Sequence, residues 1–451
     1  MRTLKSRVIA ATAWGAASQS ASQALRFFLN IFLTHILAPD LFGLTAVANV
    51  VMIGIAMVSD IGLGPSIIRS SRGTETSFRN TAYTIQVLRG AITCMIAVAV
   101  AASIELFGRN GIASANSVYA DPRLPVVIFA LSATALIAGF TSTKVHEARR
   151  SLLVGRLTVN EILAQIGGIL AILVWLWFDR SIWALVAGSI FNSIAAVLLS
   201  HTNLPGESNR FRWEHSAATE LLRFGAWIFL SSLLSFTATN CDRLLLGGLV
   251  SSETLGVYSV AYGLFSTIEQ LAARLIATIL FPALSETARE KPSQLSAVHY
   301  RIYRPAAALM YTLAGTLVMC APELVRLCYD HRYQQAGLML QILALALIGV
   351  PSQITMQLFI AKGEAQLAAL ILFGRTLFLF PATLFGFYFW GLSGAVAGIS
   401  ASFVLMLPLT WLISARKGLL RPKKEMQPFL GFLVGLGAGK GLAFLLGLIS
   451  F

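Results

Sequence analysis

Long apolar stretches alternate with short polar intervals along almost the whole chain of 451 residues. A run of about 20 apolar residues can cross the hydrocarbon core of a bilayer as an α-helix. Most of the stretches reach that length and no polar interval could hold a soluble domain, so the pattern predicts about thirteen transmembrane helices. The predicted spans are residues 9–36, 42–68, 80–104, 124–143, 152–178, 182–200, 219–248, 255–283, 303–321, 336–360, 366–388, 392–413 and 428–450.

The composition supports a membrane protein. Apolar residues make up 56% of the chain and charged residues 12%, whereas about a quarter of the residues in a soluble domain are charged. The formal net charge of +14 would suggest a nucleic-acid partner for a soluble protein. Here the basic residues lie mostly in the short polar intervals, and none of them adjoins a platform on which bases could stack. We therefore expect membrane lipid around the chain and no nucleic acid.

The basic residues of the polar intervals fall unequally on the two sides of the predicted membrane. Alternate intervals carry 22 and 5 lysines and arginines, respectively. Because cytoplasmic loops are enriched in these residues, the richer set is expected inside the cell. This predicts a multi-pass protein of the cell (inner) membrane with a cytoplasmic N-terminus. The richer set comprises the N-terminal tail and residues 69–79, 144–156, 201–217, 289–304, 362–365 and 414–427.

Two short motifs recur at nearly the same interval. Residues 36–48 match residues 249–261 at an offset of 213, with glycine in equal places, and the Val-Ala-Gly of residues 186–188 returns at 396–398 at an offset of 210. Two matches at nearly one offset predict a duplication with six helices in each copy. An even number of helices gives both copies the same orientation in the membrane.

The predicted fold is therefore an all-α polytopic membrane protein of two parallel six-helix bundles plus one extra C-terminal helix. Such duplications are common in alternating-access transporters, which bind their substrates between the lobes. The predicted divisions are residues 1–200 for the first lobe, 201–218 for a cytoplasmic linker, 219–413 for the second lobe, and 414–451 for a basic loop and the extra helix.

Charged residues also occur inside the predicted spans. A charge at the centre of a membrane helix costs roughly 2.5–3.5 kcal/mol on insertion scales, so such residues are expected to face a partner or a watery cavity. The basic ones outnumber the acidic ones, and a bound anion would neutralise the surplus. They are Arg26, Arg89, Arg223, Arg243, Arg274, Arg375 and Lys440, against Asp60, Glu161, Asp242 and Glu269.

Depth in the span separates these residues. Arg26 and Arg375 lie near the middle and are the leading candidates for binding an anionic headgroup, while Arg89 and Arg274 lie toward the cytoplasmic half and would guide it in. Arg243 stands beside the acidic residue at 242 near the outer end, where a local pair and a ligand contact both remain open. Arg223 and Lys440 are interpreted as snorkelling or packing residues. The four acids Asp60, Asp242, Glu269 and Glu161 are candidates for coupling or for salt bridges.

A polar stripe follows the first predicted helix. Ser22, Arg26 and Asn30 recur every four residues and so share one face. Residues 231, 235, 239 and 243 repeat this spacing at the offset of 213. The two stripes could line a shared cavity, which the arginine surplus favours, or form hydrogen bonds between helices. Helix breaks are expected near Gly62, Gly64 and Pro65 and at Pro351.

Nothing in the sequence predicts a metal or a nucleotide. The four cysteines make no CxxC pair or metal-ligand spacing, and the six histidines are scattered. The run Gly437-Ala-Gly-Lys-Gly441 fails the glycine spacing of a phosphate-binding loop and lacks its Ser or Thr. We expect no metal site and no cofactor.

Several motifs resemble a known family. The first half holds Ile36-Leu-Ala-Pro-Asp-Leu-Phe-Gly43 and Asp60-Ile-Gly-Leu-Gly-Pro-Ser-Ile-Ile-Arg69. The second half holds Asp242-Arg-Leu-Leu-Leu-Gly247, Leu255-Gly-Val-Tyr-Ser-Val-Ala261 and Phe281-Pro-Ala-Leu-Ser285. Over nearly its whole length the chain resembles the polysaccharide transporter (Wzx-type oligosaccharide flippase) family of the multidrug/oligosaccharidyl-lipid/polysaccharide exporter superfamily.

This resemblance implies a V-shaped pair of six-helix bundles and a flippase for undecaprenyl-diphosphate-linked oligosaccharide, used in lipopolysaccharide or exopolysaccharide export. A polymerase and glycosyltransferases of the same pathway would be its partners. Related lipid flippases direct cavity arginines toward the diphosphate, and Arg26 lies on the first helix, where such an arginine is expected. The other arginines rest on depth and charge alone.

Two other classes of protein remain open. A cation-coupled drug antiporter of the same superfamily would need membrane carboxylates to carry protons or sodium, and the surplus of basic residues argues against cationic drugs. A membrane glycosyltransferase, polymerase or ligase would carry acidic catalytic residues in a large outer loop, whereas residues 105–123 form the longest outer loop and hold only Glu105 and Asp121. We therefore expect a transporter and not an enzyme.

Overall fold

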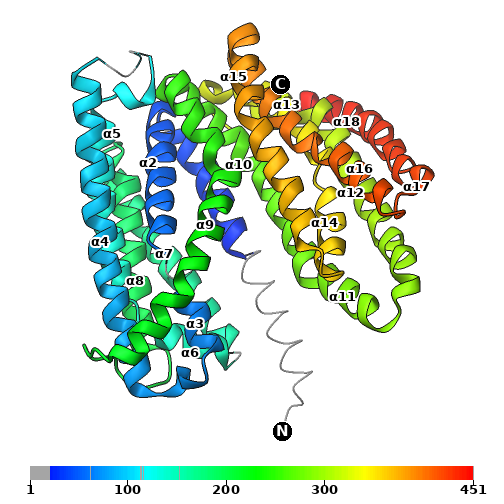
Figure 1. The fold of residues 1–451 in the computed structure, drawn as a ribbon. Helices are drawn as coiled ribbons and strands as arrows, with labels where there is room; N and C mark the ends of the chain where they lie inside the picture. Colours follow the sequence, from blue (N-terminus) through cyan, green and yellow to red (C-terminus); the bar gives the residue numbers. More distant parts are fainter. Residues whose placement is uncertain (1–20, 61, 112–113, 115, 152, 450–451) are drawn as a thin grey trace. The chain divides into compact units, whose positions relative to one another are not determined.

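The structure is a computed structural model that describes residues 21–449 except 61, 112, 113, 115 and 152. In this part of the chain every regular element is a helix (Figure 1). Residues 21–36 form the first described helix. The α-helices that follow are α2 (Pro39–Val58), α3 (Leu63–Arg69), α4 (Thr76–Arg109), α5 (Arg123–Gly139), α6 (Lys144–Arg150), α7 (Val154–Phe178), α8 (Trp183–Thr202), α9 (His215–Leu249), α10 (Ser252–Leu275), α11 (Phe281–Glu290), α12 (Leu295–Cys328), α13 (Gln335–Ala344), α14 (Ser352–Ala361), α15 (Ala365–Val404), α16 (Met406–Arg416), α17 (Pro422–Met426) and α18 (Phe429–Ile449).

Contacts divide the chain into two compact units, Met1–Glu253 and Thr254–Phe451. Helix α9 belongs to the first unit because it packs on α2 and α4, although the sequence repeat makes it the first helix of the second lobe. The two divisions differ because one is based on contacts between helices and the other on a repeat in the sequence. The division into lobes 1–200 and 219–413 therefore stays a prediction.

In the first unit, neighbouring helices pack in pairs, α4 with α5 and α7 with α8. The backbones of α7 and α8 come very close at Gly168 and Gly188. A methyl group at Gly168 would lie 2.8 Å from the carbonyl oxygen of Gly188. This close approach between small residues is typical of helix packing in membranes, where apolar side chains gain nothing by leaving the lipid.

In the second unit, α15 contains a sharp turn. Trp390 and Gly391 leave the helical region, and Gly391 has a φ of +57°, which favours glycine. The element is therefore two helices joined by a tight turn, as the separate predicted spans 366–388 and 392–413 require. The break expected at Pro351 is confirmed as well, because the 3₁₀ turn Leu345–Ile348 and a short irregular stretch separate α13 from α14.

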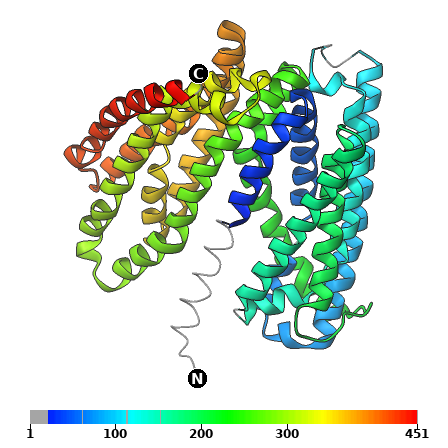
Figure 2. The ribbon, with the colours of Figure 1, turned by 180° about the vertical axis from the view of Figure 1, so that it is seen from behind.

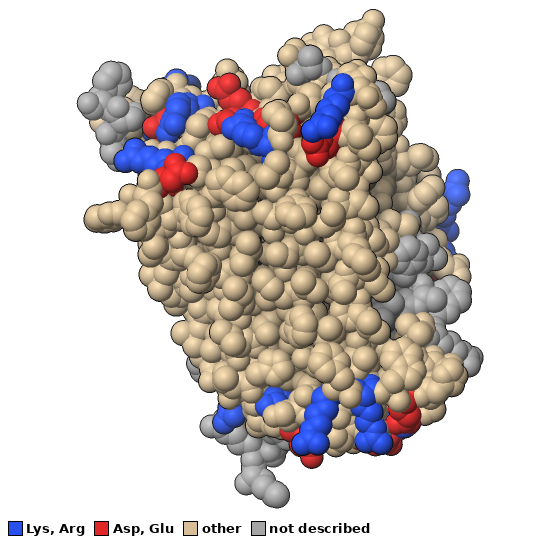
Figure 3. All heavy atoms as spheres, turned by 90° about the vertical axis from the view of Figure 1, so that its left-hand side faces the viewer, with Lys and Arg blue, Asp and Glu red and all other residues tan. Residues whose placement is uncertain are grey.

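Eight helical stretches of the described chain are long and apolar enough to cross a membrane, and a ninth results if α5 and α6, bent by 62°, form one span. Helices α9 and α10 are not among the eight. Residues 9–20 of the predicted span 9–36 lie outside the described residues, so the total of thirteen stays a prediction. Figure 3 shows Lys, Arg, Asp and Glu gathered at two ends of one face, with an uncharged band between them. The chain is thus a multi-pass integral membrane protein.

The predicted extra C-terminal helix is α18, which lies along α12 (red and yellow-green in Figures 1 and 2). Gly431, Gly435 and Gly439 form its contact face. A methyl group at Gly435 would lie 2.2 Å from the carbonyl oxygen of Thr312, and one at Gly439 would lie 2.5 Å from that of Thr316. Helix α18 is therefore attached to the second unit through direct backbone contact.

Candidate functional site

Arg26 lies exposed on the first described helix. Its Nη2 donates a hydrogen bond of 3.4 Å to Oγ of Ser22, one turn earlier. Ser22 is itself held by Gln165 of α7, because the serine hydroxyl donates to the amide oxygen and the amide Nε2 donates to the Ser22 carbonyl oxygen at 3.1 Å. Within the described part of the chain, Arg26 has no carboxylate partner. Asn30, one turn later on the same face, is half-buried.

The break between α2 and α3 places a carboxylate beside a second arginine. Gly62 has a φ of +59°, a conformation that glycine adopts without strain. Its N–H donates to Oδ1 of Asp60 at 3.0 Å, which fixes the carboxylate within the turn. Nη1 of Arg89, on α4, lies 3.4 Å from the same oxygen. The expected break near Gly62 is therefore confirmed, and it brings two candidate site residues together.

Uncharged groups also hold Arg89. Its Nη2 donates to the carbonyl oxygen of Ala56 at 3.2 Å, and its Nε donates to Oγ of Ser59 at 3.5 Å. Thr93, one turn along α4, donates to the same Ser59 hydroxyl at 2.8 Å. Arg89 thus joins α4 to the end of α2. Its side chain is still 29% exposed, so part of the guanidinium remains accessible.

In the second unit, Arg375 of α15 lies over an aromatic ring. Its Cζ is 3.6 Å from the centroid of the Phe403 ring, a cation–π contact. Phe403 meets the buried Phe265 of α10 edge to face, with ring centroids 5.3 Å apart. The two halves of α15 supply the arginine and the ring, so the turn at Trp390 and Gly391 creates this contact. The sequence did not indicate the role of either phenylalanine.

The remaining candidates are dispersed. Glu269 of α10 accepts a hydrogen bond of 2.9 Å from Nε2 of Gln353 on α14. Arg274 is half-buried shortly before a π-helical turn, Ile276–Leu280. On α9 Asp242 is buried and Arg243 half-buried. Glu161 is exposed on α7. The roles predicted for these residues stay predictions.

The two polar stripes can be followed only in part. In the first helix the structure describes Ser22, Arg26 and Asn30. In α9 the side chains of Ser231 and Ser235 lie outside the described residues. A cavity shared by the two stripes therefore stays a prediction. For Ser22 itself, the contact with Gln165 supports the interpretation that it forms hydrogen bonds between helices. No cluster of three or more His, Cys, Asp and Glu that could hold a metal occurs among the described residues.

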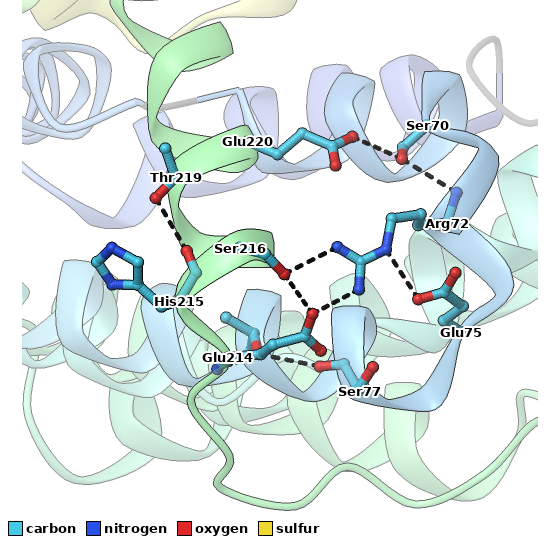
Figure 4. Close-up of polar contacts among 10 residues, drawn as sticks. Ser70, Arg72, Glu75, Ser77, Glu214, His215, Ser216, Thr219 and Glu220 are labelled. Atoms are coloured by element: carbon cyan, nitrogen blue, oxygen red, sulfur yellow. Dashed lines mark hydrogen bonds and ion pairs between the residues drawn. The ribbon is translucent and has the colours of Figure 1, made fainter.

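A polar network missed by the sequence analysis ties the start of α9 and the residue before it, Glu214, to the turn between α3 and α4 (Figure 4). Nε of Arg72 lies 2.9 Å from a carboxylate oxygen of Glu75, its Nη2 pairs with Glu214, and its Nη1 donates to Oγ of Ser216 at 3.2 Å. Ser70 donates to Glu220 at 2.7 Å. No spacing in the sequence connects groups so far apart in the chain. The sequence analysis used the basic residues of these intervals only to predict the orientation of the chain in the membrane.

Charge and hydrogen bonding favour the ionised carboxylate in this network. Hydrogen bonds from Ser216, Arg72 and Ser77, in that order, lower the pKa of Glu214 to about 2. The same carboxylate, followed by Glu75, raises the pKa of the Arg72 guanidinium. These groups link the start of α9 to the turn between α3 and α4.

The sequence is similar to that of known polysaccharide biosynthesis proteins. A family model for polysaccharide biosynthesis proteins matches residues 32–338. The lipopolysaccharide biosynthesis protein WzxC of Escherichia coli (strain K12) is 21% identical over 91% of this chain and 81% of its own length. The teichuronic acid biosynthesis protein TuaB of Bacillus subtilis (strain 168) is 23% identical over 71% of this chain and 66% of its own.

Solved structures share the fold. The lipid II flippase MurJ in an inward closed conformation superimposes with a TM-score of 0.70 at 11% identity, over 96% of each chain. An inward-facing multidrug transporter of the MATE family and the MOP superfamily gives 0.61 at 16% identity, over 95% of this chain and 96% of its own. The family match covers more than half of the sequence and the fold is that of these transporters. The chain therefore belongs to the family of polysaccharide biosynthesis proteins.

Proposed function

We propose that this protein is a flippase that moves a lipid-diphosphate-linked oligosaccharide, the repeat unit of a polysaccharide, across the cytoplasmic membrane by alternating access. Membership in a polysaccharide biosynthesis family and a fold shared with a lipid II flippase support the proposal. Undecaprenyl diphosphate is the proposed carrier lipid. A polymerase and glycosyltransferases would act before and after the transport step. No covalent bond to the protein is required.

The setting of Arg26 carries the proposal. This arginine is exposed near the middle of the predicted span 9–36, and Ser22 is its one hydrogen-bond partner among the described residues. A cation at the centre of a membrane helix costs roughly 2.5–3.5 kcal/mol on insertion scales. A bound anion would offset that cost. A diphosphate suits a guanidinium particularly well because its oxygens accept the two parallel hydrogen bonds of the fork.

Pairing between Asp60 and Arg89 would help the diphosphate headgroup to leave Arg89. While the site is empty, the carboxylate and the guanidinium pair at 3.4 Å. A diphosphate that reaches the accessible side of Arg89 would replace Asp60 as its partner. When the headgroup leaves, Asp60 would take the guanidinium back, so that the positive charge is never left without a partner. This competition weakens the hold on the substrate without a coupled reaction.

The second unit would supply a further guanidinium. Arg375 is held against Phe403, which orients its planar group. Arg274 would guide the headgroup, and Asn30 and Arg243 would complete the polar lining. The lipid tail would stay in the bilayer while the headgroup crosses. Movement between the two lobes would open this path first to the cytoplasm and then to the outside.

The test measures polysaccharide export in cells whose own transporter gene has been deleted. Arg26→Ala should abolish export while the protein is still inserted and stable. Arg26→Lys should restore export only in part, because lysine lacks the fork. The matched control is Arg180→Ala, which removes an exposed arginine between α7 and α8 and should leave export unchanged. Full export by a normally expressed Arg26→Ala protein would remove Arg26 from the site.

A further inference from the structure

A shallow cavity of about 520 Å³ opens where α7 begins and α8 ends. Its lining residues are Gly155, Arg156, Val159, Asn160 and Asn203. None of them belongs to the site described above. The cavity lies within the first unit, beside the interval 144–156, which carries four basic residues and one acidic residue.

The polar groups of this cavity are fixed in place. Asn160 is buried, and its Nδ2 donates to the carbonyl oxygen of Leu199 at 3.0 Å. Asn203 donates to Oδ1 of Asn160 at 3.0 Å. Arg156 is exposed at the rim and forms no ion pair with any residue that the structure describes. A cation beside two oriented amides is a setting that an anion would complete.

An apolar track continues from the cavity along α7. Val159, Leu163, Leu170 and Val174 follow Arg156 at intervals of three, four, seven and four residues, so all five share one helix face. The four apolar residues are 46%, 44%, 56% and 61% exposed, respectively. The face thus combines a cationic end with a long hydrocarbon surface, which matches a lipid with a charged headgroup and an extended chain.

We propose that this cavity binds the phosphate headgroup of a membrane lipid, with Arg156 on the phosphate and the hydrocarbon chain along the α7 track. The inference does not depend on the proposed transport of oligosaccharide. A single guanidinium matches the single charge of a phosphodiester, which favours an ordinary anionic phospholipid. A polyprenyl diphosphate offers the same chemistry, and the experiment separates the two.

The experiment uses native mass spectrometry of the full-length protein, released from a neutral detergent, with phosphatidylglycerol as the probe. Diacylglycerol with the same acyl chains tests whether the phosphate is needed. Arg156→Gln should weaken the first phosphatidylglycerol binding step about tenfold, as expected for the loss of one charge-assisted hydrogen-bonded pair. Arg156→Lys should retain part of the affinity. Diacylglycerol binding should not respond to either change.

Arg301→Gln is the matched control, since it removes an exposed arginine with the same charge from α12 in the second unit. If Arg156→Gln and Arg301→Gln bind phosphatidylglycerol equally well, the proposal is wrong. Thermal melting of each variant verifies that the fold is intact.

Competition with undecaprenyl diphosphate then shows which lipid supplies the bound phosphate headgroup. If it displaces phosphatidylglycerol from the wild type but not from Arg156→Gln, the site takes the carrier lipid; if it does not displace it, the site takes phospholipid.

Discussion

Arg26 and Arg89 belong to the same unit, and both lie inside predicted spans, yet their surroundings differ. Arg89 has a carboxylate, a carbonyl oxygen and a hydroxyl within reach, and it joins α4 to the end of α2. Arg26 is exposed, and its one described hydrogen bond goes to the hydroxyl of Ser22. In sequence the two residues are alike, since each is an arginine in an apolar stretch.

Arg89 therefore contributes to helix packing, whereas most of the hydrogen-bonding capacity of Arg26 remains available to a ligand. The partners of Arg89 offset much of the cost of placing its charge in the membrane. Arg26 has little such compensation among the described residues, so a substrate anion has more to contribute there. Substitution of Arg89 should therefore lower both stability and export, whereas substitution of Arg26 should lower export alone.

The largest effect should appear when the stabilities of Arg89→Ala and Arg26→Ala are compared. Arg89→Ala removes the guanidinium from the Asp60 carboxylate and the Ala56 carbonyl oxygen, each of which keeps one other donor, and should lower the free energy of unfolding by about 1–2 kcal/mol. Arg26→Ala should leave it unchanged within error while export is lost. Thermal melting in detergent, read by size-exclusion chromatography, measures the first quantity. Equal melting temperatures for the two variants would contradict the distinction.

The next largest effect on stability should come from Gly62, in the turn that holds Asp60. Gly62→Ala forces a side chain into the left-handed region and should destabilise the protein by roughly 1 kcal/mol. Because this turn holds Asp60 beside Arg89, export should fall too. Gly437→Ala is the control, since that helical glycine has open space around it. A Gly62→Ala protein as stable as Gly437→Ala would show that the turn does not depend on glycine.

A smaller effect is expected in the second unit, where an aromatic ring takes the place of the carboxylate. A double-mutant cycle of Arg375→Met and Phe403→Leu should give a coupling energy of about 0.5–1 kcal/mol, the usual range for a cation–π contact. The cycle is needed because Phe403 also packs against Phe265. Additive losses of stability would mean that the contact at 3.6 Å contributes nothing by itself.

The smallest effect concerns Glu214, a half-buried carboxylate close to solvent. Its pKa is lowered from 4.5 to about 2, so its contribution is present above pH 4.5 and is lost as the pH falls toward 2. The melting temperature of the wild type should therefore fall slightly more between pH 5 and pH 3 than that of Glu214→Gln. Parallel pH profiles for the two proteins would exclude a role for the Arg72 network in stability.

The apolar pattern predicted an all-α membrane protein correctly because length and hydropathy are local properties of the chain. It placed the turn between spans 366–388 and 392–413 correctly. It was less accurate between residues 284 and 302, where α11 continues to Glu290 and α12 already begins at Leu295. Polar residues such as Arg301 extend α12 beyond its apolar part, and a hydropathy pattern cannot detect such an extension.

The candidate site could be predicted only as a set of separate residues. The sequence identified Asp60 and Arg89 as charges at depth, but their pairing depends on how α2 ends. Phe403 was not expected beside Arg375, because many phenylalanines of this chain serve only to fill apolar helices. Partners far apart in sequence are determined by helix packing, and one sequence carries no direct record of it.

The backbone contact between α12 and α18 has a consequence for biosynthesis. Residues 329–428 are synthesised after α12 and before α18, so the α12 surface around Thr312 and Thr316 is made long before the glycines that cover it. At a translation rate of about 5–20 residues per second, several seconds pass before α18 is synthesised. During that time lipid or a chaperone must contact this α12 surface. The second unit is therefore expected to be especially vulnerable to quality-control proteases until α18 has been inserted.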